Sequence, residues 1–180
     1  DRQNNVWIGT ENGGAVMLET NNEGVAPLCF HGKEGIDESV RMIKRLPDNT
    51  ILISARDGNL YKFSSDLSQQ SVIQRGAVIY DLAVDKNGNI WEANKGQGLF
   101  LNGKPVSESL IETSSKEIFS LLSDKKGRLW VGTFGAGVDV FTPSADGKTY
   151  SHFNFLNKDY GQRRVRSLFE DSNGYIWIAT

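Results

Sequence analysis

The chain has few of the residue types that carry enzyme or metal chemistry. Its 180 residues include a single cysteine, Cys29, and only two histidines, His31 and His152. A lone cysteine cannot form an internal disulfide, and we expect Cys29 to be a small buried residue. The two histidines do not stand in a spacing typical of metal ligands. No nucleophile elbow, Walker loop or dinucleotide fingerprint occurs. The sequence therefore predicts no catalytic residue, no metal site and no cofactor.

Charge of one sign and long apolar runs are also absent. The net charge is −2 and both signs are scattered along the chain, so nothing indicates a surface for nucleic acid or an anionic membrane. No run approaches the roughly 18 apolar residues that span a bilayer, and no signal peptide precedes Asp1. Because the chain begins and ends inside the repeat described next, we interpret it as a segment of a longer protein.

The chain contains a repeated motif, Asp-x-x-Gly-x-Leu/Ile-Trp. Clear copies lie at 85–91, 124–130 and 171–177, a fourth lies at 1–7 with Asn4 in the glycine place, and a degenerate fifth ends at Leu52. The positions equivalent to the tryptophan are 39 to 47 residues apart. A period near 40, built from short apolar runs and glycine-rich turns, is typical of one four-stranded blade per repeat.

The repeat predicts an all-β chain, a β-propeller segment of four-stranded antiparallel blades. We expect four repeats and the start of a fifth at 171–180, within a larger propeller of about seven blades. The four repeats are 1–45, 46–84, 85–123 and 124–170. Repeats with exposed end strands need more chain or a partner copy. A closed four-bladed ring or a paired eight-bladed assembly is the alternative.

Within each repeat, a first strand is expected to start twelve residues before the tryptophan position, at Val40, Ile79, Ile118 and Val165. The second strand carries the tryptophan, and the position two residues later is small in every copy. This pattern predicts close packing against an adjacent blade there. The outermost strand is the least regular, and 150–153 is its best example.

The repeated Trp and Asp residues are interpreted as structural. One large residue per blade can fill the wedge between blades, and an aspartate can bond forward to backbone N–H groups in a tight turn. The residues given these roles are Trp7, Trp91, Trp130, Trp177, Asp85, Asp124 and Asp171.

A ligand site is expected on the face opposite the uniform Asp-x-x-Gly turns, where the loops vary. The second residue of each first strand would approach the mouth of a central channel there: Arg41, Tyr80, Phe119 and Arg166. Aromatic rings stack on sugars and guanidinium groups donate to hydroxyls or carboxylates, so this set suits a saccharide. Alternatively, the rings pack between blades and the arginines pair with acids. The loop 157–164 adds Tyr160, Arg163 and Arg164, which solvated surface would equally explain.

Several stretches resemble the two-component regulator propeller repeat, namely 120–141, 5–14 and 167–180. The resemblance implies the extracytoplasmic sensor region of a hybrid two-component system in a Gram-negative bacterium. Such regions lie in the periplasm, before a membrane segment, a histidine kinase and a response regulator, and many of these systems respond to oligosaccharides. It also implies a homodimer in the intact sensor, and kinase activity elsewhere in the intact protein rather than in this segment. A protein-docking scaffold and a streptogramin-lyase-like enzyme are the alternatives.

Overall fold

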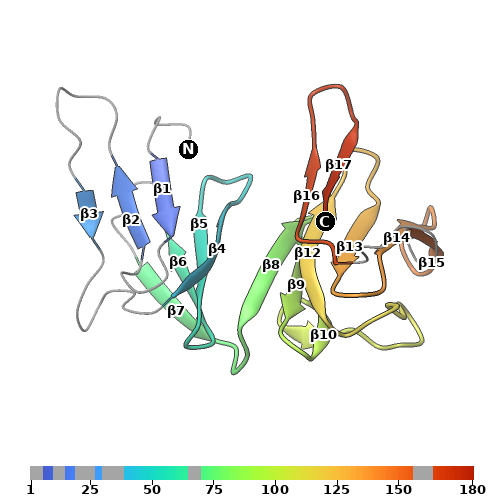
Figure 1. Ribbon diagram of the computed structural model, residues 1–180, viewed down its shortest axis with the longest axis horizontal. Coiled ribbons are helices and arrows are strands. Elements are labelled where there is room, and N and C mark those ends of the chain that lie inside the picture. The colour runs from blue at the N-terminus through green and yellow to red at the C-terminus, as the bar shows by residue number, and fades with distance from the viewer. Residues whose placement is uncertain (1–5, 10–14, 19–26, 30–38, 65–69, 156–163) are drawn as a thin grey trace. The chain divides into compact units, whose positions relative to one another are not determined.

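The computed structural model describes residues 6–9, 15–18, 27–29, 39–64, 70–155 and 164–180 (Figure 1). Every regular element in these ranges is a β-strand, which confirms the predicted all-β class. The same ranges contain no helix that could cross a membrane. The chain divides into two compact units, 1–79 and 80–180, which are described separately.

Among its described residues, unit 1 contains two sheets whose strands follow one another in chain order. The first sheet has three antiparallel strands: β1 (Val6–Gly9), β2 (Ala15–Leu18) and β3 (Pro27–Cys29). The second has four: β4 (Val40–Arg45), β5 (Ile51–Ala55), β6 (Asn59–Phe63) and β7 (Gln70–Gln74). This is the predicted blade, with the first strand preceding the turn and the tryptophan position in the second.

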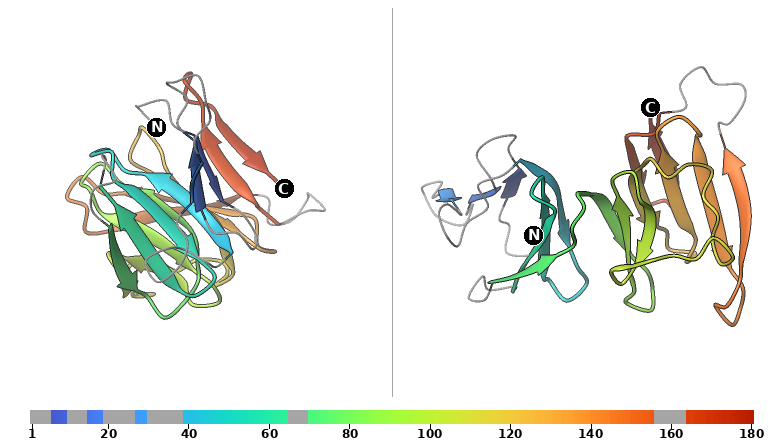
Figure 2. Two further views of the ribbon diagram at one scale, coloured as in Figure 1. Left: turned by 90° about the vertical axis from the view of Figure 1, so that its left-hand side faces the viewer. Right: turned by 90° about the horizontal axis from the view of Figure 1, so that it is seen from below.

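Unit 2 repeats this order. One sheet contains β8 (Ile79–Val84), which starts at the unit boundary, with β9 (Ile90–Asn94), β10 (Gly98–Leu101) and β11 (Lys104–Pro105). The next contains β12 (Ile118–Ser123), β13 (Leu129–Thr133), β14 (Val138–Pro143) and β15 (Tyr150–Phe155). The hairpin β16 (Ser167–Glu170) and β17 (Ile176–Ala179) lies against β12 and β13 (Figure 2).

The motif Asp-x-x-Gly-x-Leu-Trp has a local explanation in the turn before β13. Oδ1 of Asp124 accepts hydrogen bonds from the backbone N–H groups of Lys126 and Arg128, at 3.0 and 2.8 Å. Its Oδ2 accepts from the indole Nε1 of Trp130 at 2.8 Å. Gly127 takes a φ of 80°, which favours glycine, and its N–H closes the turn onto the Asp124 carbonyl. One carboxylate thus fixes the turn and the following tryptophan.

The same arrangement recurs in the other clear copies. Asp85 and Asp171 each accept from the backbone N–H groups two and four residues ahead. They also accept from the indoles of Trp91 and Trp177, at 3.2 and 2.9 Å. The three clear copies therefore share one turn, in which the aspartate holds the backbone and the tryptophan indole.

The small residue two places after the tryptophan lies under the first strand of the next blade. A Cβ atom added to Gly132 would lie 2.7 Å from Cγ1 of Val165, and one added to Gly9 would lie 2.6 Å from Cγ1 of Val40. The equivalent Ser54, in β5, is fully buried. Blades therefore approach closely at this position, and larger side chains are excluded.

Two of the first strands, β4 and β12, carry a bulge at their second residue. Val40 pairs with Ala55 while Met42 pairs with Ser54, so Arg41 is the extra residue of β4. Phe119 holds the same place in β12, between paired Ile118 and Ser120. A bulge turns its side chain out of the regular alternation.

The first strand of the last repeat, β16, begins later than expected. The predicted start at Val165 is wrong by two residues, because the N–H of Val165 bonds to the carbonyl of Thr133 in the preceding blade. Regular pairing with β17 starts at Ser167, although the N–H of Arg166 already bonds to the carbonyl of Ala179.

Candidate functional site

Three aromatic rings from two neighbouring blades form a stack in unit 2. The rings of Tyr80 and Phe119 have centroids 4.6 Å apart and planes 19° from parallel. Phe134, in the turn after β13, stacks on Phe119 at 5.0 Å and 28°. All three rings are half-buried. Tyr80 comes from β8 and Phe119 from the bulge of β12, so blade packing and bulge geometry together build the stack.

Two arginines lie over this stack. The guanidinium carbon of Arg164 is 4.5 Å from the ring centroid of Phe134. That of Arg166 is 5.2 Å from the centroid of Phe119 and 5.3 Å from that of Phe134. Both arginines are exposed, and an isolated β-bridge to Phe134 positions Arg164. We call the set Tyr80, Phe119, Phe134, Arg164 and Arg166 the aromatic–arginine cluster.

The cluster contains three of the residues predicted for a ligand site, namely Tyr80, Phe119 and Arg166. The fourth channel residue, Arg41, belongs to unit 1 and is exposed there at the bulge of β4. Tyr160 and Arg163 lie outside the described residues. The expected site is thus assembled in part, and its role in binding stays a prediction.

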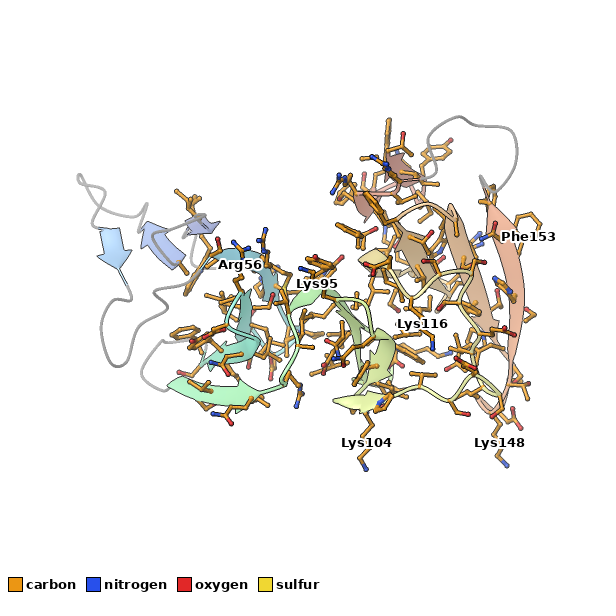
Figure 3. All side chains as sticks on the ribbon, turned by 60° about the horizontal axis from the view of Figure 1, so that its bottom comes forward. Arg56, Lys95, Lys104, Lys116, Lys148 and Phe153 are labelled. Carbon is orange, nitrogen blue, oxygen red and sulfur yellow. The ribbon has the colours of Figure 1, made fainter. Side chains whose placement is uncertain are left out.

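Sequence reasoning did not select Phe134, and it placed Arg164 only in a surface loop. A signal for Phe134 was present: the position four residues after the tryptophan varies strongly, with Glu11, Arg56, Lys95 and Phe134 in successive repeats. This variation follows a nearly uniform strand, as expected of a residue selected for binding rather than for folding. Lys95 holds the equivalent place in the blade β8–β11 (Figure 3).

No acid among the described residues neutralises the arginines of the cluster. Among the described residues, neither Arg164 nor Arg166 forms an ion pair with a carboxylate. Of the two channel arginines, Arg166 thus has no acidic partner within the described ranges, and the alternative that the channel arginines pair with Asp or Glu stays open for Arg41. By contrast, Phe119 stacks with both Tyr80 and Phe134, which agrees with the alternative of inter-blade packing for this residue.

A second polar group surrounds the fully buried Asp139. Its Oδ1 lies 2.6 Å from the hydroxyl of Ser114, 2.8 Å from Nε2 of His152 and 2.6 Å from the amide of Asn154. Its Oδ2 accepts from the N–H of Ser114 at 2.8 Å. Ser114 donates to the carboxylate and not to His152, so these residues lack the nucleophile–base pair of a serine hydrolase. The arrangement fastens the segment before β12 to β14 and β15.

A groove of about 400 Å³ lies on the opposite side of unit 2, between the Asp-x-x-Gly turns of neighbouring blades. Leu101, Leu110 and Tyr150 line it together with Asp85 and Lys86. Burial, with a smaller effect of the nearby Asp85 carboxylate, raises the pKa of the Tyr150 hydroxyl. Within the described ranges, no group of histidine, cysteine and acidic residues could hold a metal ion.

A family model matches part of the cluster. The two component regulator propeller model matches residues 112–135 and 159–180. These ranges include Phe119 and Phe134 in the first match and Arg164 and Arg166 in the second. No curated protein sequence gives a significant match to this chain.

Solved structures show the same fold. The extracellular domain described as the hybrid two component system BT3049 from B. thetaiotaomicron is 22% identical with a TM-score of 0.76. The comparison covers 100% of this chain and 25% of that one. PorZ, a bacterial surface component of the type-IX secretion system of Porphyromonas gingivalis, is 18% identical with a TM-score of 0.68. The comparison with PorZ covers 99% of this chain and 30% of the PorZ chain. The chain thus spans about a quarter to a third of these structures.

Proposed function

We propose that this chain, which carries two component regulator propeller repeats, is part of the ligand-sensing propeller of a hybrid two-component signalling protein. Its ligand is an oligosaccharide that binds at the aromatic–arginine cluster. The family match and the fold shared with an extracellular domain of such a system support this proposal. The segment lies in the periplasm in this account, and a histidine kinase elsewhere in the protein responds to binding.

The cluster is the observation that carries the proposal. Sugar rings present apolar C–H faces and a rim of hydroxyl groups, which match aromatic surfaces and guanidinium donors respectively. Tyr80 stands at one end of the ring stack, with one of its faces against Phe119. Arg166 lies over the neighbouring ring of Phe119. A saccharide would lie across this edge of the stack, while Phe119 remains a packing residue.

Signalling would follow from a change in the arrangement of paired subunits, without chemistry on the ligand. A ligand shifts such an equilibrium only as far as it binds the two arrangements differently. This mechanism needs a homodimeric sensor and assigns no catalytic residue to the segment.

A partner blade is the second component of the proposal. The hairpin β16–β17 packs one face, Leu168, Ile176 and Ile178, against Trp130 of the preceding blade. Its other face exposes Phe169, Tyr175 and Trp177. In the preceding blade the equivalent of Trp177 is Trp130, which is buried. We propose that a further blade, from the same chain or from a second copy, covers this face.

A thermal-shift screen of the complete extracytoplasmic region against defined oligosaccharides tests the function. Ligand at 100 times its dissociation constant adds about 2.7 kcal/mol to the stability, which gives a measurable shift. A selective stabilisation supports a saccharide sensor. If neither neutral nor acidic glycans stabilise the protein and it captures another protein tightly, the docking-scaffold alternative is favoured. If the protein converts a glycan to product and requires a metal to do so, the lyase-like alternative is favoured.

A further inference from the structure

The two arginines of the cluster restrict the ligand further. Resting on the proposed function, we infer that the oligosaccharide is anionic and that Arg164 and Arg166 bind its carboxylate or sulfate group. The inference rests on three features of the cluster: the position of the guanidinium groups over the rings, their exposure, and their lack of acidic partners within the described ranges.

Both guanidinium groups lie over aromatic rings of the cluster. Each lies over the ring column, at 4.5 Å from Phe134 for Arg164 and at 5.2 Å from Phe119 for Arg166. A stacked guanidinium keeps its N–H groups at its edge, from which it can donate two parallel bonds to a carboxylate or sulfate. Because the rings hold the side chains in place, less rotamer freedom is lost when an anion binds.

A third stacked arginine in the same unit shows what a structural pairing looks like. The guanidinium of Arg128 lies 4.9 Å from the ring of Trp130, and its Nε is 2.6 Å from Oδ2 of Asp124. Its charge is therefore balanced within the turn. Arg164 and Arg166 have the ring contact without such a carboxylate, in the part of the chain that the structure describes.

Lys116 and Glu117, the charged residues just before β12, do not supply a carboxylate partner for Arg164 or Arg166. Lys116, just before β12, pairs with Glu108 at 3.1 Å. Glu117 is exposed, and its carboxylate would lie 3.5 Å from a Cβ added to Gly96, in the turn after β9. Two adjacent cations beside half-buried rings attract an anion more strongly than solvated surface lysines do, and the effect weakens with salt.

Titration calorimetry of the complete extracytoplasmic region tests the inference. The probes are a galacturonic acid tetrasaccharide, a heparin-derived tetrasaccharide, a neutral galactose tetrasaccharide and inorganic sulfate. We expect one of the two acidic tetrasaccharides to bind at least about tenfold more tightly than the neutral one. Its affinity should fall when NaCl is raised from about 50 to about 300 mM. Arg164→Gln and Arg166→Gln should each weaken this binding about tenfold, as expected for loss of a charge-assisted bond.

Lys104→Gln is the matched control, because it removes the same charge from an exposed side chain that extends away from unit 2 (Figure 3). It should leave the affinity unchanged, and circular dichroism should show all three variants folded. Equal binding of the neutral and acidic tetrasaccharides, unaffected by the arginine variants, overturns the inference and leaves the saccharide sensor intact. Binding of no tetrasaccharide overturns both, and arginine-dependent binding of sulfate alone would indicate an anion site that does not recognise sugars.

Discussion

The indole N–H of Trp130 donates a 2.8 Å hydrogen bond to Oδ2 of Asp124, six residues earlier in the chain. The bond joins the turn to the second strand of its blade, and Trp130 is 6% exposed. The equivalent bond of Trp177 to Asp171 lies in the terminal hairpin, where Trp177 is 63% exposed. The same sequence motif therefore has a buried and an exposed copy within one unit.

Replacement of Asp124 by asparagine should destabilise the fold by about 1–3 kcal/mol, because several donors then lose a charged acceptor at a buried site. Urea unfolding followed by tryptophan fluorescence measures the loss. Asp171→Asn is the matched control and should cost less, since water can replace the lost bonds in the exposed copy. Equal losses in the two variants would show that burial does not determine the strength of this turn.

The contribution of Asp124 should depend on pH in the acidic range. Burial opposes ionisation of this carboxyl, but hydrogen bonds from Trp130 and Arg128 outweigh burial and lower its pKa. A folded-state pKa below the unfolded value of about 3.9 means that the ionised group stabilises the fold above that pH. The stabilisation is lost as the pH falls through the folded-state value.

Unfolding of the wild type and of Asp124→Asn between about pH 2 and 7 checks this sign. The difference in unfolding free energy should be constant above about pH 5 and should shrink below about pH 4. A difference that grows on acidification would contradict the assignment.

Gly132→Ala should destabilise unit 2 by about 1–3 kcal/mol, because the new methyl group would overlap the Ser120 hydroxyl of its own blade and Val165 of the next blade. The double variant with Val165→Ala should recover part of this loss, since the smaller side chain makes room for the methyl group. A chemical-denaturation cycle of the four proteins measures the coupling. Strict additivity would show that contact with Val165 does not contribute to the cost of the added methyl group.

Phe169→Ser should destabilise the complete protein by about 2 kcal/mol or more if another blade covers the hairpin. Phe153→Ser is a matched control, because the two phenylalanines are 62% and 61% exposed in this segment. Phe153 lies on the outer strand β15 (Figure 3), where no blade is expected. Thermal unfolding of the complete protein compares them, and equally small effects would contradict the proposed partner blade.

The blade could be predicted from sequence because its interactions are local. Asp124 bonds to groups two, four and six residues ahead, so the spacing of the motif itself encodes the turn and the tryptophan contact. Close packing at Gly132 was predicted from the small residue that recurs two places after every tryptophan position, although the contact itself reaches Val165 of the next blade.

The site could be predicted only in part, because its contacts cross between blades. The stack joins Tyr80 to Phe119 and Phe134 across two blades, and Arg164 reaches it from a third. Separations in sequence do not encode these contacts. The bulge that turns Phe119 out of the strand alternation also has no signature in the residues, because isoleucine, phenylalanine and serine suit a regular strand equally well.

The affinity of Tyr80→Ala for a saccharide that stabilises the complete extracytoplasmic region tests the central claim most directly. Calorimetry of this variant beside the wild type and Phe153→Ala separates loss of the cluster from loss of any exposed aromatic ring. We predict that Tyr80→Ala binds at least about tenfold more weakly, equivalent to about 1.4 kcal/mol, while Phe153→Ala binds as the wild type does. Unchanged affinity in a folded Tyr80→Ala protein would contradict the claim that the aromatic–arginine cluster is the binding site.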